Sequence, residues 1–158
     1  MNTFRSTEHG RASAFAEAPM AGITVKRFAK PDETRAFTDK GRAEILKFAD
    51  GAVGRGVFEP GWKWSIHVKP IAATRSCQVA HSGYCVSGRM QVRMDDGQEA
   101  EIGPGDFAVI EPGHDAWTVG REPCVIVDFA GMESYARPAR GSARVEPRAD
   151  EGRPAGHP

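Results

Sequence analysis

Short stretches of alternating hydrophobic and polar residues recur along the middle of the chain, and turn-forming residues separate them. Several short strands at intervals of roughly ten residues are typical of a β-sandwich or barrel, whereas βαβ units need longer helical patterns between strands. We therefore expect an all-β fold. The predicted strands lie at 23–28, 43–48, 52–58, 64–68, 77–86, 90–94, 99–102, 107–110, 116–119 and 124–129.

One stretch favours a helical turn instead. At 31–35, Pro31 is followed by Asp32 and Glu33. Proline fits the first position of a helix, and acidic side chains interact favourably with the positive end of the helix dipole. We expect a short N-terminal helical turn here, ahead of the strands.

Both ends of the chain differ in composition from the middle. Residues 1–21 show no sustained hydrophobic period, and residues 137–158 are rich in arginine and proline and contain no aromatic residue. Such segments bury too little apolar surface to offset the entropy of ordering. We expect two disordered tails around one domain at 22–136, and a chain of 158 residues with 40% hydrophobic residues suits a single core.

Charge and cysteine content narrow the possible partners. The 21 basic and 21 acidic residues cancel, so the sequence favours neither nucleic acid nor an anionic membrane as a partner. No apolar run approaches the ~20 residues that span a bilayer, and the N-terminus lacks the apolar core of a signal peptide. The odd number of cysteines, without CxxC spacing, favours reduced thiols. We expect a cytoplasmic protein with a small-molecule partner.

Histidines supply the candidate chemistry. His67, His81 and His114 are the histidines of the predicted folded region, and each lies in or beside a predicted strand. Strand alternation places Cys77 on the same face as His81, while His114 follows a Pro-Gly turn. Imidazole nitrogens and a thiolate are donors that suit divalent first-row metals. Asp115, next to His114, has two interpretations: a carboxylate that orients His114, or an exposed turn residue.

Two stretches resemble the sequence motifs of the cupin superfamily. The first opens with Gly61 and His67, with five residues between them, and closes with His81 and Gly88, with six residues between them. The second is the run Gly105-Asp106 to Pro112-Gly113-His114. The resemblance covers about 60–130, and it implies a single jelly-roll β-barrel with a metal site inside. It also implies a homodimer, in which strands before Gly61 pair with the partner subunit.

The chain departs from the cupin pattern at several positions. Lys69 replaces the second histidine of the usual HxH pair, and His81 stands where cupins usually carry glutamate. Cys77, four residues before His81, occupies the spacing of the missing histidine, and it is either a ligand or a buried structural thiol. Ala116 holds the usual place of the last histidine, which here is His114. The resemblance thus implies a metal site drawn from His67, Cys77, His81 and His114.

A ligand set without carboxylate favours zinc, with Fe, Cu, Ni and Mn as alternatives. Four protein ligands would close a tetrahedral shell, and three would leave one position open, as in catalytic zinc sites. Two functions follow from the resemblance. One is a metal-dependent enzyme of lyase, isomerase or hydrolase type, rather than a glutamate-ligated dioxygenase, acting on a small molecule in the barrel. The other is a non-catalytic sensing or regulatory cupin, similar to those beside bacterial signalling domains.

Overall fold

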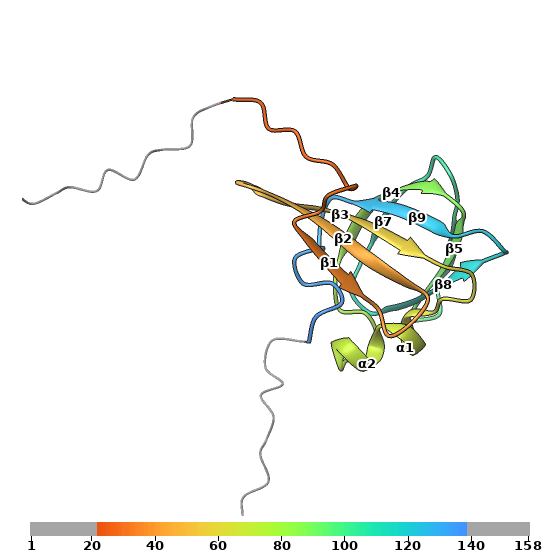
Figure 1. Ribbon diagram of the computed structural model, residues 1–158. Helices are drawn as coiled ribbons and strands as arrows, with labels where there is room; N and C mark the ends of the chain where they lie inside the picture. The colour runs from red at the N-terminus through yellow and green to blue at the C-terminus, as the bar shows by residue number, and fades with distance from the viewer. Residues whose placement is uncertain (1–21, 139–158) are drawn as a thin grey trace, which may run out of the picture.

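The computed structural model describes residues 22–138, which form two antiparallel sheets facing each other (Figure 1). The larger sheet has the strand order β1-β2-β3-β9-β4-β7, and the smaller has the order β6-β5-β8. The prediction of an all-β jelly-roll fold is confirmed. The disorder expected at 1–21 and over 139–158 concerns residues outside this described part.

Nine strands and two helical turns make up the fold, and the helical turns lie together at one end of the two sheets (Figure 1). In the part of the chain described here, no helix is long and apolar enough to cross a membrane. The elements are β1 (Glu33–Ala36), β2 (Gly41–Phe48), β3 (Gly51–Phe58), α1 (Trp64–His67), α2 (Lys69–Ala72), β4 (His81–Ser87), β5 (Arg89–Met94), β6 (Glu99–Ile102), β7 (Phe107–Ile110), β8 (His114–Val119) and β9 (Cys124–Asp128).

The core lies between the two sheets, where the inward residues of each strand meet. Aromatic rings fill one end of it: the rings of Phe58 and Trp62 lie 4.4 Å apart between centroids, and those of Phe37 and Phe58 lie 5.7 Å apart. Offset and tilted ring pairs at such distances stabilise a core beyond the area they bury. The three cysteines are free and buried within the same core, as expected of reduced thiols.

The prediction of a helical turn at 31–35 is wrong. Glu33–Ala36 is strand β1, which pairs antiparallel with β2, with Glu33 opposite Ile45. The amide of Asp32 also donates to the carbonyl of Ile45, at 2.9 Å. Pairing with a neighbouring strand satisfies these backbone groups and overrides a weak local preference for helix.

The prediction of a strand at 64–68 is also wrong, because this stretch forms α1. The amides of Ile66 and His67 both donate to the carbonyl of Lys63. Trp64 and His67, three residues apart, lie on the buried side of the turn. The strand expected at 77–86 begins only at His81, and Cys77 forms an isolated bridge with His114 instead.

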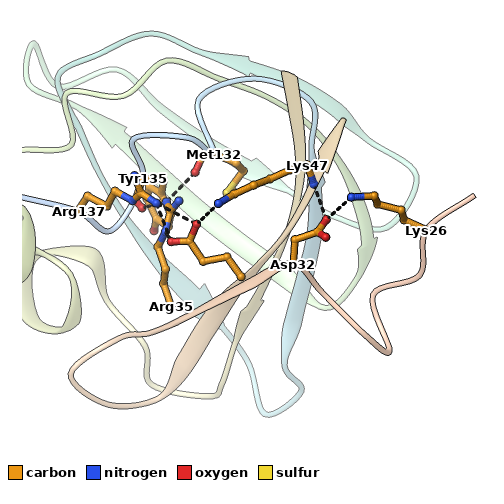
Figure 2. A network of polar contacts seen from close by, with 8 residues as sticks. Lys26, Asp32, Arg35, Lys47, Met132, Tyr135 and Arg137 are labelled. Atoms are coloured by element: carbon orange, nitrogen blue, oxygen red, sulfur yellow. Dashed lines mark hydrogen bonds and ion pairs between the residues drawn. The ribbon is translucent and has the colours of Figure 1, made fainter. Parts of the chain in front are cut away.

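Residues 131–138, which we call the C-terminal strap, fold back against β1. The Arg35 guanidinium donates from Nη1 to the carbonyls of Met132 and Tyr135, at 2.7 and 2.6 Å (Figure 2). Glu33 receives hydrogen bonds from Arg35, Arg137 and Lys47, and these hold its pKa well below the usual range. β1 therefore carries the side chains that fix the strap in place.

Candidate metal centre

Three metal-binding side chains meet between the two sheets. The ligand atoms of Cys77, His81 and His114 all lie within 4.8 Å of one another. His81 begins β4 of the larger sheet, His114 begins β8 of the smaller sheet, and Cys77 precedes β4 in the connecting segment. Segments far apart in sequence thus contribute to one buried cluster.

The main chain fixes Cys77 beside His114. The Cys77 amide donates to the carbonyl of His114 at 2.8 Å, and the Gly113 amide donates to the carbonyl of Cys77 at 2.7 Å. Gly113 has φ of 93°, a left-handed conformation that glycine adopts without a Cβ penalty. The Pro-Gly turn found in the sequence therefore serves to bring His114 to Cys77.

His81 is held by a buried carboxylate. Its Nδ1 donates to Oδ2 of Asp128, and its Nε2 lies 3.6 Å from Sγ of Cys77. Burial disfavours a charge on His81, but the hydrogen bonds with Asp128 and Cys77 outweigh it and raise the pKa of His81 to about 9. The second oxygen of Asp128 accepts from the amide of Ala130, so the carboxylate itself is fixed.

His114 is oriented by the main chain instead of by a carboxylate. Its Nδ1 donates to the carbonyl of Glu111 at 2.7 Å, so Nε2 is the ring nitrogen available to the cluster. Metal-binding histidines usually donate their other ring N–H to a carboxylate or a carbonyl, and this fixes the tautomer and ring direction. Both histidines of the cluster meet that requirement.

Cys77 is buried, and its environment favours the thiolate. Burial opposes ionisation of the thiol, but hydrogen bonds with His114 and His81 lower the pKa of Cys77 to about 6. A thiolate is the form of cysteine that binds metal. One thiolate and two imidazoles are a donor set that fits zinc and other borderline-soft first-row ions.

His67 is the predicted ligand that the structure does not bring to the cluster. It lies in α1, where its Nδ1 accepts a hydrogen bond from the Lys63 amide at 2.9 Å. The Asp115 carboxylate does not orient His114 either: its Oδ1 accepts from the amides of Ser65 and Ala116, and the His114 ring is held by Glu111. These two residues stabilise α1 and the start of β8.

Asp128 and Tyr135 belong to the site, although sequence reasoning missed both. Asp128 left a weak signal, as the charged residue on the inward side of the apolar strand β9. Tyr135 left none. Its ring packs edge-on against His81, with 5.1 Å between centroids, and burial, Cys77 and Asp128 raise its pKa well above the usual value. It is therefore a neutral phenol beside the cluster.

Two cavities meet at this cluster. The inner one, of about 50 Å³, lies within the barrel and is lined by His81, His114, Asp128 and mostly apolar side chains. The outer one, of about 640 Å³, lies beneath the C-terminal strap and is lined by Cys77. Trp64, Met132 and Tyr135 line both. The strap thus forms part of the wall between the cluster and the outer cavity.

Comparison with known proteins finds a family model that matches part of the chain. Residues 66–125 match the family model of the EutQ-like cupin domain, and they contain Cys77, His81 and His114. The match supports a cupin domain in this part of the chain. No curated protein matches the chain.

Several solved structures are similar at low identity. A protein of unknown function from Acinetobacter is 13% identical, over 62% of this chain and 89% of that one, with a TM-score of 0.46. A predicted oxalate decarboxylase from Thermotoga maritima is 14% identical, over 66% and 96%, with a TM-score of 0.47. A sugar phosphate isomerase from Silicibacter pomeroyi is 21% identical, over 63% and 73%, with a TM-score of 0.44.

Proposed function

We propose that the protein is a metal-dependent enzyme that acts on a small molecule, with zinc held by Cys77, His81 and His114. The observation that carries the proposal is the meeting of these three donor atoms within 4.8 Å. The hydrogen bonds that orient both imidazoles support it, because they leave Nε2 of each ring for the metal.

Three protein ligands leave one position of a tetrahedral zinc shell open, which is the arrangement of catalytic zinc sites. A zinc ion held by these three residues would supply polarisation of a substrate oxygen or a lowered pKa for a bound water molecule. The residues of this chain supply the surroundings: Asp128 fixes His81, and the neutral phenol of Tyr135 stands beside it as a hydrogen-bond group. The absence of a carboxylate from the cluster of described residues favours a lyase, isomerase or hydrolase over a dioxygenase.

The cavities favour a small ligand that carries hydrogen-bond acceptors. The indole N–H groups of Trp62 and Trp64 are buried and have no partner among the described residues, and both residues line the inner cavity. Buried donors are nearly always satisfied, so an acceptor atom in that cavity is expected. The outer cavity has a volume in the range of ligand pockets, roughly 300–1,000 Å³, and is the route by which a substrate would reach Cys77.

A non-catalytic sensing module is the second candidate. Among the described residues that line the inner cavity, the one carboxylate is Asp128, and its hydrogen bonds to His81 and Ala130 already occupy it. A free acid or base poised for proton transfer is therefore not evident there. This favours reversible binding of a ligand over turnover.

Elemental analysis of protein purified without chelator tests the metal site. We expect about one equivalent of zinc per chain, a large loss in His81→Ala, and no loss in the control His67→Ala, whose ring lies outside the cluster. Circular dichroism of each variant reports whether it has folded. Metal-free wild-type protein, or equal metal content in folded His81→Ala, would refute the site.

Cobalt substitution distinguishes a metal site with a free coordination position from one whose coordination shell is complete. Cobalt(II) bound by Cys77 should give a thiolate charge-transfer band, which Cys77→Ser should remove. Azide, a small anionic probe, should shift the spectrum if one coordination position is open. An unchanged spectrum would show a closed shell and would favour the sensing module over the enzyme.

A further inference from the structure

Trp62 carries a hydrogen-bond donor that binds nothing within the described part of the chain. Its side chain is 1% exposed, and its indole N–H has no acceptor among residues 22–138. The residue lines the inner cavity and not the outer one, so the inner cavity is the space open to an acceptor. Trp64, which lines both cavities, has a second buried indole N–H without an acceptor in this part of the chain.

The Trp62 ring is fixed and does not turn to find an acceptor elsewhere. The Trp62 amide donates to the carbonyl of Glu59 at 3.0 Å, and the Trp62 carbonyl accepts from the amide of Thr118 at 3.1 Å. The ring packs against those of Phe37 and Phe58, with centroids 5.9 and 4.4 Å away. Burial without a hydrogen bond is costly, so a fixed donor of this kind marks the place of an acceptor atom.

The inner cavity admits a small, mainly apolar group. Its volume is about 50 Å³, and one water molecule takes about 10–15 Å³ of such space, so the cavity holds on the order of four non-hydrogen atoms. Apolar side chains make up most of its wall, among them Phe58, Met90, Ile102, Ile110 and Ile126. Since such a wall offers few polar partners, the group that enters has one acceptor and an otherwise apolar surface.

The inner cavity also offers no partner for an anion. Among the described residues that line it there is no lysine or arginine. A zinc ion at the cluster would carry two positive charges, which the thiolate of Cys77 and the carboxylate of Asp128 would balance. Asp128 is 2% exposed and lies in the wall of the same cavity. An anionic ligand would therefore add an unpaired negative charge in a buried place, which is strongly unfavourable.

We infer that the inner cavity binds an uncharged molecule whose oxygen atom accepts a hydrogen bond from the indole N–H of Trp62. A compact carbonyl compound, such as a short ketone or amide, has the size, the acceptor and the neutrality that this cavity requires. A carboxylate of the same size has the acceptor but the wrong charge. The inference rests on the proposed function in taking the barrel interior as the ligand site, and it narrows the substrates to neutral molecules.

Three probes of four non-hydrogen atoms separate charge from shape. Acetone and acetamide are uncharged, whereas acetate is an anion of nearly the same size. Each is titrated into the zinc-loaded full chain, labelled with nitrogen-15 in its three tryptophans, because an indole N–H that gains an acceptor shifts its NMR signal. We expect a saturable shift of the Trp62 signal with acetone and acetamide, and at least about tenfold weaker binding of acetate.

Trp62→Phe removes the donor but keeps an aromatic ring in the core. It should weaken acetone binding by about three- to tenfold, read from the methyl signal of Met90, which lines the same cavity. Trp117→Phe is the matched control, because Trp117 does not line this cavity and its ring lies beneath Lys63 and Arg93. This variant should bind acetone as the wild-type protein does.

Failure of this inference differs from failure of the metal centre. Zinc-loaded protein whose Trp62 signal responds to none of the probes, or responds equally to acetate, would overturn the inference and leave the metal centre standing. Equal acetone affinity in folded Trp62→Phe would overturn it too. A protein that holds no zinc but still shows the response of Trp62 to acetone would refute the metal centre alone.

Discussion

His81 and Asp128 form a buried pair that decides which ring nitrogen of His81 faces Cys77. Because Nδ1 donates to the carboxylate, Nε2 is directed at the thiol sulfur, 3.6 Å away. The two residues lie 47 positions apart in sequence, on neighbouring strands β4 and β9. The sheet register therefore sets the chemistry of the cluster as much as the ligands do.

Asp128→Asn is expected to weaken zinc binding by about 10- to 100-fold, because residues that orient a metal-binding histidine typically contribute that much. The change keeps the size of the side chain but removes its charge. Competition against a zinc chelator measures the affinity. Asp115→Asn is the matched control, since Asp115 bonds to amides outside the cluster and its variant should bind zinc normally. Equal affinities for Asp128→Asn and the wild type would show that the pair does not tune the site.

In the metal-free protein, a thiolate is expected to appear as the pH rises through about 6, because His114 and His81 lower the pKa of Cys77 to that value. An ordinary cysteine would ionise only near its usual value of 9.0. Ultraviolet absorbance of the thiolate reports the titration. Burial raises the pKa of Cys85 and Cys124, so Cys77→Ser should abolish the signal below pH 8. A midpoint near the usual value would mean that the histidines do not stabilise the thiolate.

Arg35→Ala is expected to destabilise the protein by roughly 3 kcal/mol, since it leaves two buried carbonyls of the strap without a charged donor. Urea unfolding measures the loss, and limited proteolysis should show earlier cleavage within 131–138. Arg42→Ala, which removes a more exposed arginine from an ion pair on β2, should cost less than about 1 kcal/mol. Similar losses of unfolding free energy in the two variants would show that the hydrogen bonds from Arg35 to the strap do not account for the effect of Arg35→Ala.

Gly54→Ala is expected to displace the strap, because a Cβ at Gly54 would lie 2.1 Å from Cγ of Met132. Overpacking of this kind typically costs 1–3 kcal/mol, roughly. The double variant Gly54→Ala with Met132→Ala should recover part of the loss, and a double-mutant cycle measures the coupling. Gly103→Ala, where the nearest atom lies 3.8 Å away, serves as control. Strictly additive losses would show that Met132 does not pack on Gly54.

Strands such as β5 and β8 could be predicted because their residues alternate between a buried and a more exposed face, and alternation is a local property. The predictions at 23–28, 31–35 and 64–68 failed, since 23–28 forms no strand, 33–36 is β1 and 64–67 is α1. The last of these shows the limit of that argument. Trp62, Trp64 and Ile66 alternate as in a strand, and a helical turn of four residues is too short to display a 3.6-residue period. The predicted orientation of the His67 side chain assumed a strand at 64–68. The position of His67 relative to the cluster could therefore not be predicted from the sequence.

Cys77, His81 and His114 were predicted as neighbours from motif spacing, and the structure brings them together. Asp128, Tyr135 and Arg35 could not be predicted in the same way. Their roles arise from contacts between segments that are distant in sequence, such as the pairing of β4 with β9 and the return of the strap to β1. A single sequence does not encode such contacts in any local pattern.

The strap has a consequence for how the protein is made. Met132 and Tyr135 follow Cys77, His81, His114 and Asp128 in the chain, so a ribosome synthesises the whole cluster before it synthesises this part of its wall. Chains emerge at roughly 5–20 residues per second, and the strap must also reach Arg35 before it can close. This wall of the cluster is thus complete only when the strap has met β1, across separations of 97 and 100 residues in the chain.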